Sequence, residues 1–185
     1  METQALIDKK VRTYKLLSIL FTLFSILALV VTFWPINREK LIENTKASLN
    51  INNSDSETQA QAIKLLQDTF AYQDSLMARI LLGITVILTI IVLVFYVQNY
   101  MKARKNILPD ALVSYIVFGK IAFDTLVFLL QIHTIIGSLE VAVIIGAVIV
   151  ASLGILMQYW YLNTRNDWED LTFELAEEFI TDENE

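Results

Sequence analysis

The chain has 185 residues, 55% of them hydrophobic, and a formal net charge of −6. An acidic chain is a poor match for nucleic acid, which binds basic surfaces. With no cysteine and one histidine, the sequence excludes disulfides, thiolate metal sites, cysteine nucleophiles and a multi-histidine metal site within one copy. The apolar residues lie in long runs, which predicts an all-α integral membrane protein.

Residues 1–15 form a basic start, and an uncharged apolar run follows from Leu16 to Trp34. The run has about the 20 residues that a helix needs to cross a bilayer. It is too long for the hydrophobic region of a signal peptide, and no small-residue cleavage site follows it. We therefore expect a cytoplasmic N-terminus over residues 1–15 and a retained transmembrane helix over residues 16–34.

Residues 35–78 are polar, yet apolar side chains recur in them at helical spacing on both sides of a turn-rich break at residues 50–56. These side chains are Leu41, Ile42 and Leu49 before the break and Ala60, Ile63, Leu66 and Phe70 after it. Such spacings are typical of one face of a helix. The segment predicts a helical hairpin on the extracytoplasmic side, whose second helix runs directly into the next span.

Three more apolar segments predict a second transmembrane helix over residues 79–101, a third over residues 111–133 and a fourth over residues 140–162. A basic loop, residues 102–110, and a short outer turn, residues 134–139, join them. Lysine and arginine are more numerous in the N-terminus, the basic loop and the segment after the fourth span than in the long hairpin. The positive-inside rule then places both termini in the cytoplasm and the hairpin outside the plasma (cell) membrane.

The tail, residues 163–185, holds nine acidic residues against one arginine. Asn166 and Glu169 indicate a new helix start. One face of this helix carries large apolar side chains, namely Trp168, Leu171, Leu175 and Phe179. The pattern predicts an amphipathic acidic helix in the cytoplasm, whose apolar face is a costly patch if it is left exposed. Three interpretations stay open: docking on a partner protein with a basic groove, docking on the chain's own basic loop, and disorder.

Two charged residues, Lys120 and Asp124, fall near the middle of the third span. Each ionised side chain at the centre of a bilayer costs about 2.5–3.5 kcal/mol on insertion scales. One turn apart on the same helical face, the two side chains can neutralise each other. They form a candidate intramembrane site, and they are also able to serve a purely structural role.

Each of the four spans carries one stripe of polar or small residues on an otherwise apolar circumference. The polar members that we assign to the bundle interior are Ser18, Thr22, Ser25, Thr85, Thr89, Gln131 and Gln158. In lipid, such side chains bridge helices by hydrogen bonds. The stripes predict a four-helix bundle with a polar interior, which either fixes the register of the helices or forms a hydrophilic path with Lys120 and Asp124 as gate or binding site.

No metalloprotease, phosphate-loop or nucleophile-elbow motif is present in the sequence. We therefore expect a non-enzymatic protein without cofactor or metal. The first hypothesis is a subunit or accessory of a larger membrane complex, which docks another membrane or cytoplasmic protein through the acidic tail and the outer hairpin. The alternative is a small oligomeric transporter or channel for an ion or small solute, in which a second copy of the chain completes the path.

Overall fold

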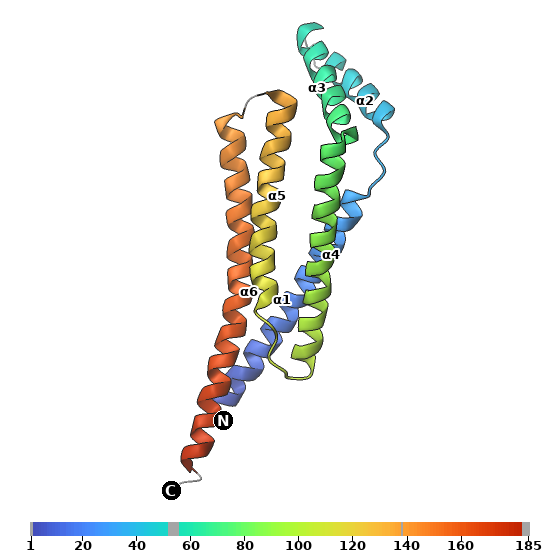
Figure 1. Ribbon diagram of the computed structural model, residues 1–185. Coiled ribbons are helices and arrows are strands. Elements are labelled where there is room, and N and C mark those ends of the chain that lie inside the picture. Colours follow the sequence, from blue (N-terminus) through green and yellow to red (C-terminus); the bar gives the residue numbers. More distant parts are fainter. Residues whose placement is uncertain (1, 52–55, 138, 183–185) are drawn as a thin grey trace.

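The computed structural model describes residues 2–51, 56–137 and 139–182. Within these ranges the chain is all-helical, with six helices and no strand. Four of the helices are long and apolar enough to cross a membrane, so the chain is a multi-pass membrane protein. They are α1 (Glu2–Thr32), α4 (Leu76–Arg104), α5 (Leu112–Ile136) and α6 (Val141–Asp182). The shorter and more polar helices α2 (Arg38–Ile51) and α3 (Ser56–Asp74) form a hairpin beyond one end of the bundle (Figure 1).

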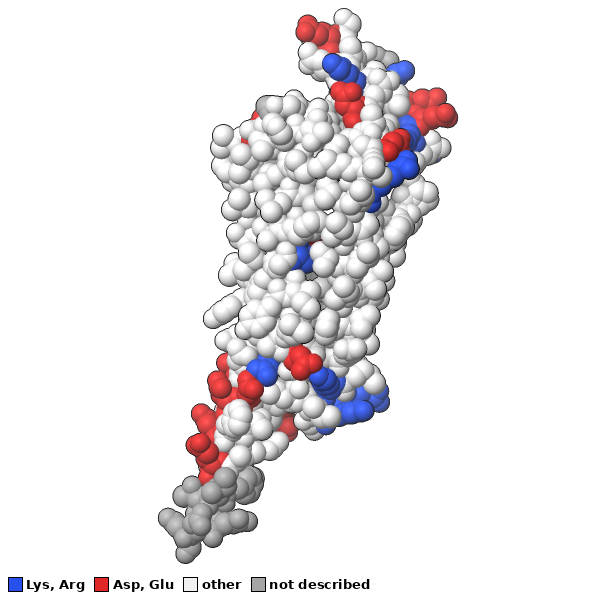
Figure 2. Space-filling model, in the orientation of Figure 1, with Lys and Arg blue, Asp and Glu red and all other residues white. Residues whose placement is uncertain are grey.

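Both chain termini lie at the end of the bundle opposite the hairpin (Figure 1). We call these two ends the terminal end and the hairpin end. The connection between α4 and α5 lies at the terminal end, and the connection between α5 and α6 lies at the hairpin end. Charged side chains gather at both ends, with a broad, almost uncharged band between them (Figure 2). This distribution matches the expectation for four apolar helices in a bilayer.

Two helices extend well past the expected spans. Helix α1 begins at Glu2 and includes the basic N-terminal stretch. Helix α6 runs from Val141 to Asp182 without a break, so the new helix start expected at Asn166 is not used. The reason is local, since no glycine or proline follows Gly154 to stop the helix. In addition, Arg165 and Glu169 form an ion pair one turn apart across the expected boundary.

The helix ends near the hairpin have definite stops. Helices α3 and α4 are separated at Ser75, whose Oγ accepts a hydrogen bond from the backbone N–H of Ala78 at 3.2 Å. The second hairpin helix therefore leads directly to the span, and Ser75, the single residue between them, is the N-cap of α4. Helix α5 ends at Gly137, which adopts a left-handed φ of 75° and donates its N–H to the carbonyl of His133 at 2.8 Å. The turn expected at residues 50–56 includes residues 52–55, which lie outside the described ranges.

The four long helices associate as two pairs, α1 with α4 and α5 with α6. Helix α1 also packs on α6, about as extensively as α5 does, and α5 packs on α4, whereas the backbones of α1 and α5 do not approach each other within the described residues. Close approach within the second pair depends on Gly154, because a Cβ atom there would lie 3.3 Å from Cδ1 of Ile121. The pairs are joined by side chains at the terminal end, and they separate toward the hairpin end (Figure 1).

The most buried part of the molecule is an aromatic cluster near the terminal end. It consists of Tyr14, Phe21, Tyr96, Tyr161 and Trp168. Tyr14 stacks on Tyr161 with 4.4 Å between ring centroids, and it meets Trp168 edge-on at 6.2 Å. Tyr96 stacks on Phe21 at 5.3 Å. These rings come from α1, α4 and α6, so the cluster fastens the two helix pairs together at this end.

Candidate functional site

The two charged residues of α5 meet as the sequence predicts from their spacing. Lys120 Nζ donates a hydrogen bond to Oδ2 of Asp124 one turn away. The other carboxylate oxygen, Oδ1, accepts a hydrogen bond from Thr85 Oγ1 of α4 at 3.3 Å. The side chains of Lys120 and Asp124 keep 17% and 36% of their surface exposed, so the pair is not sealed inside the bundle. It ties α5 to α4 and remains accessible.

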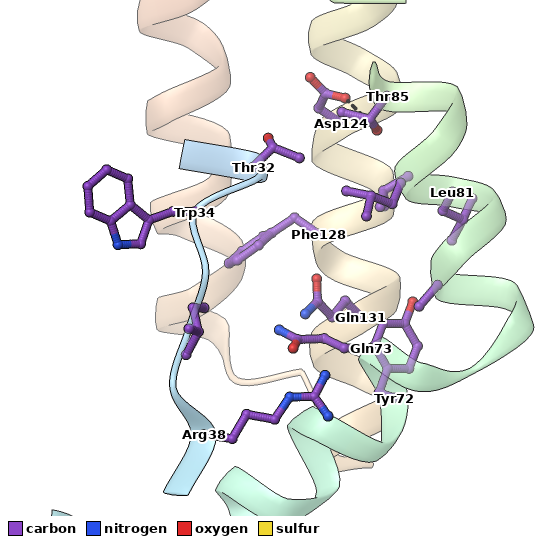
Figure 3. A pocket seen from close by; sticks show the side chains of 14 residues that line it. Thr32, Trp34, Arg38, Tyr72, Gln73, Leu81, Thr85, Asp124, Phe128 and Gln131 are labelled. Atoms are coloured by element: carbon purple, nitrogen blue, oxygen red, sulfur yellow. Dashed lines mark hydrogen bonds between the residues drawn. The ribbon is translucent and has the colours of Figure 1, made fainter. Parts of the chain in front are cut away.

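That exposure opens into a cleft of about 540 Å³ between α4 and α5. The cleft begins at the hairpin end and stops at Asp124 and Thr85, as Figure 3 shows. Its walls come from the end of α1 and the segment after it, the end of α3, the first turns of α4 and the second half of α5. The lining residues include Trp34, Arg38, Tyr72, Gln73, Phe128 and Gln131.

Several polar groups in the cleft have no hydrogen-bond partner among the residues that the structure describes. The hydroxyl of Tyr72 is buried and makes no hydrogen bond. The side-chain amides of Gln73 and Gln131 also lack a hydrogen-bond partner among the described residues, and they lie near each other beside Phe128 (Figure 3). The buried hydroxyl of Tyr72 is unusual in this respect, whereas Gln73 is exposed and Gln131 is half-buried. These groups are therefore available to a molecule that enters the cleft.

The rim of the cleft carries a charge cluster that closes the base of the hairpin. Arg38 at the start of α2 donates two hydrogen bonds to Asp74 at the end of α3, at 2.6 and 3.1 Å. Arg79 lies 3.8 Å from the same carboxylate, and the guanidinium of Arg38 sits 5.0 Å from the ring centroid of Phe70. The hydrogen bonds from Arg38 hold the pKa of Asp74 below its ordinary value of 3.8.

The hairpin base is expected to loosen in acid. Because the pKa of Asp74 is lowered in the folded protein, its ionised form stabilises the pair at neutral pH. This contribution is lost as pH falls below 3.8 and through the lowered pKa. Spin labels at the exposed positions Lys40 and Ala71 report the distance between α2 and α3. We expect a narrow distance distribution at pH 7 and a broad one below the lowered pKa.

The variant Asp74→Asn is the control for this titration. It removes the ionisable carboxyl and should give the broad distribution at every pH, because the charge-assisted hydrogen bonds from Arg38 are gone. A narrow distribution that persists in Asp74→Asn would show that apolar contacts between α2 and α3 close the hairpin without the ion pair.

A second cavity, of about 480 Å³, lies between α5 and α6. Its lining is mostly apolar and includes Phe128, Val143, Gly146 and Ala147. Asp124 borders this cavity as well as the cleft.

The terminal half of the bundle is closed by a hydrogen-bonded network among buried side chains. Tyr96 Oη donates to Gln158 Oε1 at 2.7 Å, and Gln158 Nε2 donates to Ser114 Oγ at 2.9 Å. Ser18 Oγ and Tyr161 Oη share a hydrogen bond at 3.1 Å. These bonds join α4, α5 and α6 in one chain and α1 to α6 in another. Together with the aromatic cluster they form a seal across the terminal half.

A second buried amide completes the seal at the connection between α4 and α5. Asn99 Nδ2 donates to Tyr14 Oη at 3.1 Å and to the carbonyl of Asp110 at 2.9 Å. Its Oδ1 accepts the backbone N–H of Asp110 at 3.3 Å. Arg165 Nε donates to the carbonyl of Pro109 at 3.0 Å. The loop is thus fixed to α1, α4 and α6 by groups that would otherwise be unpaired.

The polar residues expected to form one interior divide into three groups. Ser18 and Gln158 are buried and belong to the seal. Thr85 and Gln131 are half-buried and face the cleft. The other three hydroxyls donate to backbone carbonyls one turn earlier in their own helices. Thr22 donates to Ser18 at 2.7 Å, Ser25 to Phe21 at 2.9 Å, and Thr89 to Thr85 at 2.7 Å.

The apolar face of the tail lies against the first helix of the same chain. Trp168 is 3% exposed and packs on Tyr14, and Leu171 and Leu175 are partly buried against the same core. Lys10 of α1 forms an ion pair with Asp167. The side chain of Phe179 lies outside the described residues. The apolar face of the tail thus covers the N-terminal part of α1, while Arg165 at the start of the tail binds the basic loop at Pro109.

Two important residues were not predicted from the sequence, namely Tyr14 and Tyr72. A signal existed for the aromatic cluster, because Tyr14 and Phe21 are seven residues apart, as are Tyr161 and Trp168. That spacing puts each pair on one face of its helix. Tyr72 had no such signal, since its position in the cleft depends on how the hairpin returns to the bundle.

Neither a metal-binding cluster nor a similar protein assigns a role to these residues. Among the residues that the structure describes, no group of three or more histidine, cysteine, aspartate or glutamate side chains is placed to hold a metal ion. No family model, curated protein or solved structure matches the chain. The protein class rests on the helices themselves, four of which are long and apolar enough to cross a membrane, and the cleft between two of them ends at Asp124.

Proposed function

We propose that this protein is a small non-enzymatic carrier that binds a polar solute in the cleft, here open toward the hairpin end. The observation that carries the proposal is the asymmetry of the bundle. One half holds a 540 Å³ cleft that ends at Asp124, the carboxylate paired with Lys120, and the other half is closed by buried hydrogen bonds. A binding site that is open to one side and closed to the other is what alternating access requires.

The charged pair supports an aqueous cleft. An ion pair that faces hydrocarbon is costly, whereas water in a polar-lined cleft solvates the exposed third of the Asp124 side chain. The cleft volume also lies within the range of about 300–1,000 Å³ that small-molecule sites occupy. Opening of the seal would require the pair α5–α6 to move against α1–α4, which is a rigid-body motion of two packed units.

The orientation that we propose places both termini in the cytoplasm of a cell and the hairpin outside its plasma membrane. Support comes from the basic residues at the terminal end, which are Lys9, Lys10, Arg12, Lys15, Lys102, Arg104, Lys105 and Arg165. The hairpin segment carries fewer, namely Arg38, Lys40, Lys46, Lys64 and Arg79. The cleft then faces outward.

The test uses the absence of native cysteine, because single cysteines can be introduced without background. Val127 lines the cleft, whereas its neighbour Leu126 is 67% exposed on the outer surface of α5 and would face lipid. A maleimide reacts with the thiolate, which forms in water and not in hydrocarbon. In sealed vesicles we expect Val127→Cys to react with a membrane-impermeant maleimide at least tenfold faster than Leu126→Cys.

A third cysteine, Ser114→Cys, reports on the seal, since Ser114 is 1% exposed. It should stay unreactive from either side of the vesicle in the resting protein. Equal, slow labelling of Val127→Cys and Leu126→Cys would mean that lipid fills the cleft, and the carrier proposal would then be wrong. Labelling of Val127→Cys only from the side of the termini would mean that the cleft opens at the terminal end, which contradicts the proposed seal.

The second candidate function is a subunit of a larger membrane complex. It is favoured by the outer face of the tail, where Phe173 is 66% exposed beside the acidic residues Asp170 and Glu174. The apolar face that the sequence analysis assigned to docking is covered by α1, so a partner with a basic groove would bind this outer face instead. Co-purification of a partner from mild detergent that Phe173→Ser abolishes would support this function.

A further inference from the structure

Resting on the proposed carrier function, we infer that the solute is uncharged and polyhydroxylated, a sugar or other polyol, and not an inorganic ion. The first reason is that the charges of the cleft are already paired. Asp124 is matched by Lys120 on its own helix, and Arg38 at the rim is matched by Asp74. A cation would have to compete with Lys120, and an anion would have to compete with Asp74. A neutral solute leaves both ion pairs intact.

The second reason is the type of group left without a partner. Tyr72 offers a hydroxyl, and Gln73 and Gln131 each offer an amide with two donor hydrogens and one acceptor oxygen. The carboxylate of Asp124 adds acceptor capacity at the deep end. Donors and acceptors are thus mixed along the whole cleft. A ligand hydroxyl is both donor and acceptor, so a molecule with several hydroxyls fits this mixed set better than a simple ion.

The third reason is the apolar surface between these groups. Phe128 lies between the amide groups and the Asp124 end (Figure 3). Binding sites for organic molecules combine such aromatic walls with a few placed polar groups. The carbon-bound hydrogens of a sugar ring can pack on such an aromatic face.

The experiment measures protection of Val127→Cys in the full-length protein in vesicles. D-glucose, sucrose, glycerol and myo-inositol are tested against NaCl, KCl and sodium phosphate at matched osmolarity. We expect at least one of the four polyols to slow maleimide labelling at least fivefold in a saturable way, and the salts to leave the rate unchanged. Protection by a salt without protection by any polyol would overturn the inference.

Two variants test whether the named groups hold the solute. Tyr72→Phe removes a hydroxyl that has no partner in the protein, so the unliganded protein should keep its thermal stability. Its half-protective polyol concentration should nevertheless rise at least tenfold, as should that of Gln131→Leu. Gln98→Leu, an exposed glutamine of α4 outside the cleft, is the matched control and should change nothing.

The outcomes separate this inference from the function on which it rests. If Val127→Cys labels rapidly and no polyol protects it, the cleft is aqueous and the carrier proposal stands, but the solute class is wrong. If Val127→Cys does not label at all, the carrier proposal fails and the inference fails with it. Unaltered protection in both Tyr72→Phe and Gln131→Leu would also overturn the inference.

Discussion

Replacing Lys120 with alanine is expected to destabilise the bundle by about 3 kcal/mol, because it leaves the Asp124 carboxylate in the apolar band without its cationic partner. The remaining contact from Thr85, at 3.3 Å, comes from a neutral hydroxyl and compensates only in part. The expected value is at the low end of the range for broken buried pairs, since the carboxylate side chain is 36% exposed. The unfolding transition in mild detergent measures it.

The double variant Lys120→Leu, Asp124→Leu is expected to recover most of the lost stability, because no unpaired charge remains. Lys120→Arg keeps a cation one turn from Asp124 and serves as the control that should stay close to the native protein. If the destabilising effects of Lys120→Leu and Asp124→Leu, each measured alone, simply add in the double variant, the two residues act independently. If the pair also contributes to solute binding, the folded double variant loses polyol protection of the cleft.

The sequence was sufficient to predict the four spans and the contact between Lys120 and Asp124. Both are local properties, since a span depends on the length of an apolar run and the ion pair depends on a spacing of four residues. The sequence was also sufficient to predict that Ser18 and Thr85 occupy inward-facing stripes. It could not predict that they belong to different structures, one to the seal and the other to the cleft.

The sequence does not contain the angle between the helix pairs, which decides whether an inward-facing residue meets a partner helix. A helical wheel gives the direction of a side chain, not how far apart two helices are at its depth. Thr22 and Ser25 lie on the predicted inner stripe, yet their hydroxyls bind backbone carbonyls of α1. The same limitation hid the role of residues 1–15. Their basic side chains indicated orientation, while Ile7, Val11 and Tyr14 among them form the surface that receives the tail.

Replacing Trp168 with alanine is expected to destabilise the packing of the tail on α1 by about 3–5 kcal/mol, the usual cost of deleting a buried tryptophan side chain. Trp168 is 3% exposed, and its ring contacts Tyr14 edge-on. The ion pair between Lys10 and Asp167 does not offset this loss, because both side chains are about one-third exposed and such pairs contribute about 0–1 kcal/mol. The tail should therefore leave α1 and become sensitive to limited proteolysis.

Phe173→Ala is the matched control, since it removes an aromatic side chain five residues further along the same helix that is 66% exposed. It should leave the protease resistance of the tail unchanged. A protected tail in both variants would mean that the ring of Trp168 contributes little to docking, and that the other contacts of the tail hold it on α1. A tail released by Trp168→Ala alone assigns the apolar face to the chain itself, so any partner must bind the acidic face that carries Phe173.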